Sequence, residues 1–201
     1  MHLGAQLLDA DGVVASVSQV LLVPPLAVAL ATGVTERTRM VRLVLLALFF
    51  SWLGDTVPRF LHGDAGFLAM VGAFLFAQCA YIAAFQPLRD DAAPWTRWAP
   101  RTPYVVAFLV LVVWCGRSAG AMLAPVVVYG IALTLMAILS TGVSRVAGVG
   151  GALFMLSDAL IALRAFADVD IAGFGVMLTY VAGQALICAG VAARVGRRAW
   201  G

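Results

Sequence analysis

Two acidic residues lie inside apolar runs of the chain. Asp55 is near one end of a run, in FFSWLGDTV, and Asp158 is near the middle of another, in ALFMLSDAL. A charge at mid-membrane costs about 2.5–3.5 kcal/mol on insertion scales, so such residues usually face a cavity or a partner. Two carboxyl groups in one bundle suit acid–base catalysis, in which one group is protonated and the other ionised. For either residue alone, a hydrogen-bonded or arginine-paired structural carboxylate is the alternative.

Polar residues accompany these two carboxyl groups. Ser51 lies four residues before Asp55 and therefore shares its helix face. Taken singly, each polar residue is more often a hydrogen bond between helices than a catalytic group. Together they are expected to line one polar chamber around the two carboxyl groups. The set comprises Ser51, Gln78, Tyr81, Tyr129, Ser157, Tyr180 and Gln184.

Other chemistries are excluded by residue type. There is no lysine, so no Schiff base can form and a retinal protein is excluded. His2 and His62 lie at the terminus and in a loop, which excludes a Ser–His dyad within the membrane. Cys79, Cys115 and Cys188 form no CxxC pair and are expected to be free and buried. We therefore expect no metal and no cofactor.

The amino-acid composition distinguishes a membrane protein from a soluble one. The chain has 201 residues, of which 63% are hydrophobic and 11% charged, with a mean hydropathy of +1.01. A soluble domain has about 45–50% apolar and about 25% charged residues. The sequence therefore predicts an integral membrane protein that forms one transmembrane domain over residues 1–201. The N-terminus lacks the basic region of a cleavable signal peptide, so the first apolar run is interpreted as a retained span.

Apolar runs of the required length predict the fold. A span needs about 20 apolar residues, and a lipid-exposed segment must be helical because its backbone groups find no other partners. The expected fold is all-α, a polytopic bundle of about seven transmembrane helices. The predicted spans are 13–32, 40–58, 65–86, 103–117, 120–141, 147–166 and 171–193.

The arginines predict the orientation. All 13 basic residues are arginine, and ten fall on one side of the predicted spans against three on the other. The positive-inside rule then places the N-terminus outside and the C-terminus in the cytoplasm. It also explains the pI near 9.1 without a nucleic-acid partner. Trp95 and Trp98 are expected at the cytoplasmic interface. The absence of lysine and asparagine suggests a GC-rich bacterial gene, hence a bacterial plasma membrane.

Small residues mark the expected helix contacts. Ala69, Ala73 and Ala77 repeat on the third predicted span. Gly150 and Gly151 lie near the start of the sixth predicted span. Such residues let helix backbones approach closely in a membrane, so we interpret them as packing features.

Longer segments resemble a known family. RLVLLALFFSWLGDTV, followed by GFLAMVGAFLFAQCAYIAAF, is similar to the YhhN-type lysoplasmalogenases, in which one span ends in Gly-Asp and the next is aromatic-rich. GGALFMLSDALIALRAF and TYVAGQALICAG resemble the family's later spans, so the similarity covers residues 20–193. The chain departs from the family where Gln78 replaces a histidine and where Pro24-Pro25 replaces Lys-Pro. Members often have eight spans.

The resemblance implies hydrolysis of the vinyl ether of a lysoplasmalogen to a fatty aldehyde and a glycerophospho-alcohol. A vinyl ether is cleaved by protonation of carbon, and water captures the resulting oxocarbenium ion. By span position Asp158 is the deeper group, so we assign it as the acid and Asp55 as the base or cation stabiliser. Arg59 and Arg164 are candidates for the substrate phosphate. The expected partners are a lysophospholipid substrate and membrane lipids.

Two alternatives belong to other functional classes. A small-molecule or proton-coupled carrier would use Asp55 and Asp158 as relay groups, and would predict internal inverted repeats or broken helices. No convincing repeat is evident in the sequence. The second alternative is a non-catalytic lipid-binding member of the family, inactive because Gln78 replaces the histidine.

Overall fold

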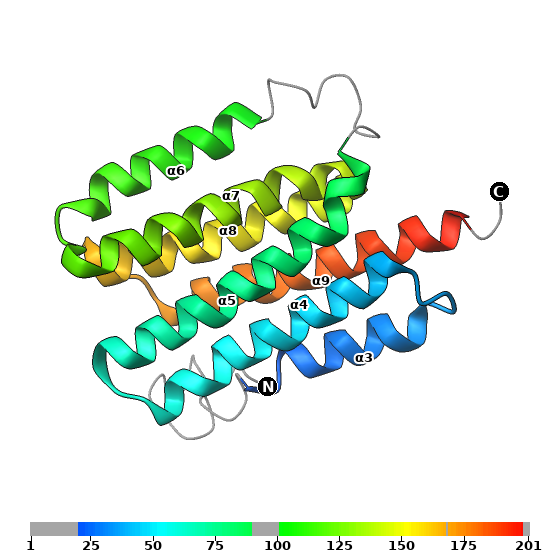
Figure 1. The fold of residues 1–201 in the computed structure, drawn as a ribbon, viewed down its shortest axis with the longest axis horizontal. Helices are drawn as coiled ribbons and strands as arrows, with labels where there is room; N and C mark the ends of the chain where they lie inside the picture. The colour runs from blue at the N-terminus through cyan, green and yellow to red at the C-terminus, as the bar shows by residue number, and fades with distance from the viewer. Residues whose placement is uncertain (1–19, 90–100, 168, 199–201) are drawn as a thin grey trace.

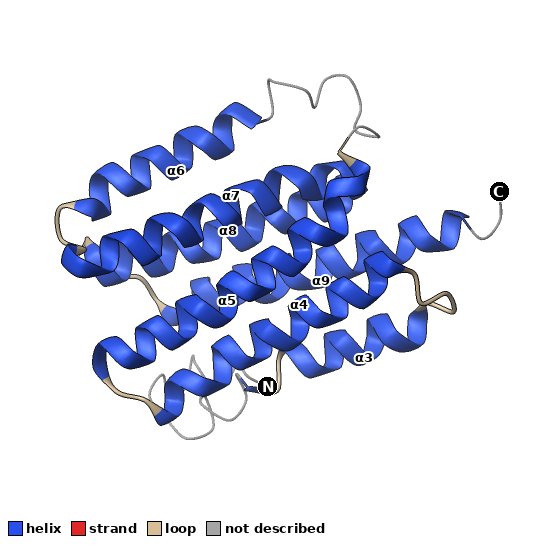
Figure 2. Ribbon diagram, in the orientation of Figure 1, coloured by secondary structure: helices blue, strands red, loops and turns tan. Residues whose placement is uncertain are grey.

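The computed structural model describes residues 20–89, 101–167 and 169–198 (Figure 1). Within these ranges the ordered elements are all helices, as Figure 2 shows, and the predicted membrane helix bundle is confirmed. Five of the helices are long and apolar enough to cross a membrane. In chain order the elements are α3 (Val23–Gly33), α4 (Arg39–Thr56), η1 (Val57–Phe60), α5 (Gly63–Phe85), η2 (Gln86–Leu88), α6 (Arg101–Gly116), η4 (Gly120–Met122), α7 (Leu123–Val143), α8 (Arg145–Phe166) and α9 (Gly173–Arg198).

Two of the helices at the seven expected spans are short for a membrane crossing. Helix α3 has 11 residues and α6 has 16. At 1.5 Å per residue these are about 16 and 24 Å long, below the hydrocarbon thickness of about 30 Å. Pro24 and Pro25 occupy the first turn of α3, where a missing N–H is tolerated, and so favour a helix start at this point. The beginning of the predicted span 13–32 lies outside the described residues, as do Trp95 and Trp98.

Successive helices run in alternating directions, as Figure 1 shows. The α4–α5, α6–α7 and α8–α9 connections lie at one end of the bundle, which we call the α8–α9 end. Arg59, Arg117 and Arg164 belong to these connections or to the helix turn beside them. The described arginines of the larger predicted group belong to the opposite end, for example Arg39 and Arg145 at the starts of α4 and α8. This alternation matches the arrangement on which the predicted orientation depends.

Glycines allow α8 and α9 to approach closely. A Cβ atom added to Gly183 would lie 2.8 Å from the backbone nitrogen of Phe154, and one added to Gly150 would lie 2.7 Å from the carbonyl oxygen of Gly183. Side chains at these positions would therefore displace the backbone of the facing helix. The predicted packing role is confirmed for Gly150. The contact brings the ring of Tyr180 on α9 against Phe154 on α8.

Side-chain caps define where two of the site helices begin. The Thr38 hydroxyl accepts a hydrogen bond from the backbone N–H of Val41 at 3.3 Å, at the start of α4. The Ser144 hydroxyl accepts one from Ala147 at 3.1 Å, at the start of α8. Each cap satisfies one of the backbone donors that a helix start leaves without an intrahelical partner.

Candidate active site

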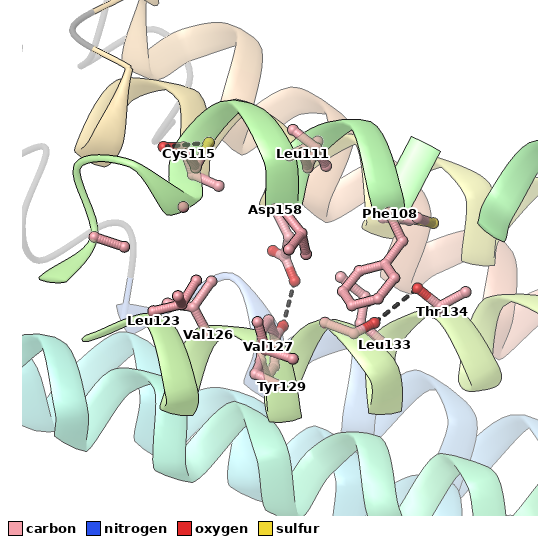
Figure 3. Close-up of a pocket in the computed structure, with 17 residues that line it drawn as sticks. Phe108, Leu111, Cys115, Leu123, Val126, Val127, Tyr129, Leu133, Thr134 and Asp158 are labelled. Carbon is pink, nitrogen blue, oxygen red and sulfur yellow. Dashed lines mark hydrogen bonds between the residues drawn. The ribbon is translucent and has the colours of Figure 1, made fainter. Parts of the chain in front are cut away.

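Asp158 lies on α8 and faces α7. The hydroxyl of Tyr129 donates a hydrogen bond to Oδ2 of Asp158, and both side chains point into the same space (Figure 3). The Ser157 hydroxyl is 3.2 Å from Oδ1 of Asp158 and 3.0 Å from the carbonyl oxygen of Phe154, so its proton serves two acceptors. The carboxyl group is partly buried, so it is both fixed by neighbours and accessible from a pocket.

Gln78 extends this hydrogen-bonded group onto α5. Its Nε2 donates to the Tyr129 hydroxyl at 3.5 Å, and the residue is 0% exposed. Its amide oxygen, Oε1, is buried and has no hydrogen-bond partner among the described residues. Gln78, Tyr129, Ser157 and Asp158 therefore form one group, called here the Asp158 group.

Two facing pairs of polar residues join α4 and α9. The Tyr180 hydroxyl donates to Oδ2 of Asp55 at 2.8 Å, and Nε2 of Gln184 donates to the Ser51 hydroxyl at 3.1 Å. The residues of each helix are four apart and so share a face, and α4 and α9 run in opposite directions. The four-residue spacing of Ser51 and Asp55 on α4 therefore matches the four-residue spacing of Tyr180 and Gln184 on α9.

Tyr81 adds a third helix to this second group. Its hydroxyl donates a hydrogen bond to Oε1 of Gln184, and both residues are 0% exposed. Asp55 is 7% exposed, so it is more completely enclosed than Asp158 although Asp158 is further from a helix end. The Asp55 group comprises Ser51, Asp55, Tyr81, Tyr180 and Gln184.

Two phenylalanine rings, Phe74 and Phe154, lie between the two groups and pack on Tyr180 of the Asp55 group. Tyr180 packs edge-to-face on Phe154, with ring centroids 5.5 Å apart, and on Phe74, at 5.9 Å. Phe74 also packs on Gly54, next to Asp55: a Cβ atom added to Gly54 would lie 2.7 Å from its ring. The expected single polar chamber is thus arranged as two hydrogen-bonded groups with aromatic rings between them.

Phe74 and Phe154 were not among the residues predicted for the site. A signal was present, since Phe74 lies four residues before Gln78 and Phe154 four residues before Asp158. Each ring therefore shares a helix face with a polar residue of the Asp158 group. Apolar residues are so common in this chain that the spacing alone does not distinguish these two from lipid-facing ones.

Two apolar pockets meet at Asp158. The first, the α6 pocket, lies between α6, α7 and α8 and is shown in Figure 3. The second, the α5 pocket, lies between α5, α7 and α8 and includes Phe74. Tyr129 and Asp158 line both pockets. Their other walls are largely hydrocarbon, from residues such as Phe108, Leu111, Leu123, Val126, Met155 and Ala159 in the α6 pocket, and Phe67, Met70, Val71, Ile161 and Phe166 in the α5 pocket.

The two arginines considered for phosphate binding are exposed. Arg59 lies in η1 and donates from Nε to the carbonyl oxygen of Asp55 at 3.0 Å. Arg164 lies in the last turn of α8. Both are at the α8–α9 end, and neither is among the residues that line the two pockets. Among the described residues, no three His, Cys, Asp or Glu side chains come together as metal ligands.

Comparison with known proteins identifies the family. No curated protein and no solved structure matches the chain. The model of the YhhN family matches residues 14–191, a range that contains both carboxyl groups and every residue of the two hydrogen-bonded groups. The chain therefore belongs to the YhhN family.

Proposed function

We propose that this protein is a membrane hydrolase that cleaves the vinyl ether bond of a lysoplasmalogen-type lysolipid. The observation that carries the proposal is the position of Asp158, a carboxyl group at the junction of two apolar pockets and hydrogen-bonded to Tyr129. A substrate that fits this environment is mostly hydrocarbon and has one bond that an acid can break. Family membership supports the same class of reaction.

The proposed reaction begins with carbon protonation. Asp158 donates its proton to the vinyl carbon remote from the ether oxygen, and the other vinyl carbon and the oxygen share the positive charge. Water adds to that carbon and gives a hemiacetal, its released proton returning to a carboxylate. The hemiacetal then breaks to a fatty aldehyde and a glycerophospho-alcohol, so one water is consumed. The chemistry parallels glycoside hydrolysis, which also passes through an oxocarbenium-like state.

Asp55 has the second role in this proposal. It is buried and held by Tyr180, behind the rings of Phe74 and Phe154. A negative charge and aromatic faces both favour a cation nearby. We assign Asp55 to stabilisation of the oxocarbenium ion, and Asp158 to proton transfer because it lines the pockets.

The pockets suggest how the lipid lies. The α6 pocket is apolar, and Cys115 is the one buried residue among those described in α6. A single hydrocarbon chain placed there would bring its vinyl ether to Asp158. The phosphate would then reach the α8–α9 end, where Arg59 and Arg164 are exposed. In the proposed orientation this is the outer face, and the C-terminus is cytoplasmic.

The carrier alternative has less support. Transporter sites are often built from discontinuous helices. In this chain α4, α5, α7, α8 and α9 are each continuous where they carry site residues. A hydrolase therefore accounts for the arrangement of these helices better than a carrier does.

Aldehyde release from a defined lipid tests the function. Purified protein in detergent is given a lysoplasmalogen or its saturated ether analogue, which has no carbon that accepts a proton in this way. The expected result is fatty aldehyde from the vinyl ether alone, and its loss in Asp158→Asn. Folded protein that binds the lipid but releases no aldehyde would support the non-catalytic alternative and overturn the proposal.

A further inference from the structure

Gln78 combines two properties that rarely occur together. It is 0% exposed, yet its amide oxygen has no hydrogen-bond partner among the described residues. Most buried polar atoms in proteins have a partner, so an exception calls for an explanation. The other end of the same amide donates to Tyr129, which in turn donates to Asp158.

The three residues form a chain in which every hydrogen bond points toward Asp158. The Gln78 N–H donates to the Tyr129 oxygen, and the Tyr129 O–H donates to Oδ2 of Asp158. Both bonds suit an ionised Asp158, which has acceptors only. A protonated Asp158 has a proton to donate, and the Tyr129 oxygen is already within reach.

Reversal of the chain would then satisfy the protonated state. Asp158 would donate to the Tyr129 oxygen, the Tyr129 hydroxyl would rotate toward α5, and the Gln78 amide would turn to present Oε1 as the acceptor. Because Oε1 has no other described partner, this turn breaks no hydrogen bond at that atom. A carboxamide has a donor and an acceptor of nearly equal size, so both directions fit the same space.

We propose that Gln78 is a positioning residue whose amide reverses with the protonation state of Asp158, so that Tyr129 supports both the acid and its carboxylate. This inference rests on the proposed function for its catalytic meaning. Before the reaction the chain holds the proton of Asp158 in place. After the proton moves to the substrate carbon, the chain returns to the direction that the structure shows and donates toward the new carboxylate. No net proton passes through Tyr129 or Gln78.

Other groups near Asp158 do not perform this role. The Ser157 hydroxyl contacts Oδ1, and the Cys115 thiol, which lines the α6 pocket, is 3.7 Å from the carbonyl oxygen of Ala162. On the described elements packed around Asp158, the titratable side chains that share its pockets are Tyr129 and Cys115. The link through Tyr129 is therefore the route by which Gln78 acts.

Infrared difference spectroscopy tests the inference without substrate. The carbonyl band of protonated Asp158 is identified by its loss in Asp158→Asn. Gln78→Met removes both the donor and the acceptor while keeping the length of the side chain, and it should shift this band. Gln184→Met is the matched control, because Gln184 is also a fully buried amide but belongs to the Asp55 group. That control should leave the band unchanged.

A double variant separates positioning from general packing. Tyr129→Phe should shift the same band, and adding Gln78→Met should shift it no further, because Gln78 acts through Tyr129. The rate of aldehyde release should fall about fivefold to tenfold in Gln78→Met and show the same lack of additivity. A band that Gln78→Met leaves in place, or a further shift in the double variant, would overturn the inference. A wild-type protein with the expected bands and no aldehyde release would overturn the proposed function alone.

Discussion

The hydroxyl of Tyr129 donates a hydrogen bond to Oδ2 of Asp158, and this pair lines both the α6 pocket and the α5 pocket. One residue comes from α7 and the other from α8, so the contact also joins two helices. A carboxyl group placed in this way has polar support on one side and hydrocarbon on the other. The proposed reaction requires this combination, because the acid must hold its proton and must reach an apolar substrate.

Loss of the acid should nearly abolish the reaction. Asp158→Asn keeps the size of the side chain but has no proton to transfer. General acid catalysis contributes about 10²–10⁴-fold, so aldehyde release should fall by that order. Asp55→Asn should reduce the rate less, because its proposed role is electrostatic. Equal losses in the two variants, measured with thermal unfolding as a check on folding, would contradict this division of roles.

The hydrogen bond from Tyr180 to Asp55 should contribute to thermal stability. Tyr180→Phe removes the hydroxyl that donates to the buried Asp55 carboxyl group. Loss of a hydrogen bond to a buried carboxyl group costs about 1–3 kcal/mol, and each kcal/mol lowers the midpoint of thermal unfolding by about 2–4 °C in a chain of this size. Tyr104→Phe is the control, because Tyr104 is a half-buried residue of α6, and this variant should unfold near the wild-type temperature. Equal midpoints for the two variants would contradict the assigned contact.

Narrowing the α6 pocket should change chain-length preference. Ala159 lines this pocket, and Ala159→Leu would fill part of it. The expected result is a relative loss of activity toward the longest chains, with short chains affected least. Ala165→Leu adds the same group to an exposed position of α8 and should leave the profile unchanged. A profile that Ala159→Leu does not alter would argue that the chain lies elsewhere.

Close packing of α8 and α9 should depend on Gly183. In Gly183→Ala the new Cβ would lie 2.8 Å from the backbone nitrogen of Phe154, and overpacking of this kind costs about 1–3 kcal/mol. Gly175→Ala, on the same helix, has nothing within 4 Å of its Cβ. Thermal unfolding should therefore show a lower midpoint for the first variant and no loss for the second. Equal stability would contradict the close approach of the two helices.

Much of this architecture was predictable because a membrane restricts the backbone. Apolar runs indicated helices at seven places, and the structure has a helix at each. Helix boundaries were less predictable: α3 begins at Val23, next to Pro24, inside the predicted span 13–32. Hydropathy measures how apolar a run is, whereas the start and end of a helix depend on local caps and prolines.

The candidate site was predictable in its residues but not in its grouping. Rarity of polar side chains in apolar runs singled out Asp55, Asp158 and their companions. Helical spacing also indicated that Ser51 and Asp55 share a face, as Tyr180 and Gln184 do. Helical spacing could not show which helices face one another. That arrangement determines that Gln78 belongs to the Asp158 group. Nor could the spacing show Phe74 between the groups, because tertiary packing alone distinguishes it from other phenylalanines.

The isotopic composition of the released aldehyde tests the central claim most directly. The protein is given a lysoplasmalogen in D₂O, and the aldehyde is trapped at once and analysed by mass spectrometry. Protonation of the vinyl carbon predicts one deuterium on the carbon next to the carbonyl, in a product that Asp158→Asn does not release. No aldehyde from the wild-type protein, or aldehyde without that deuterium, would contradict the proposed hydrolysis.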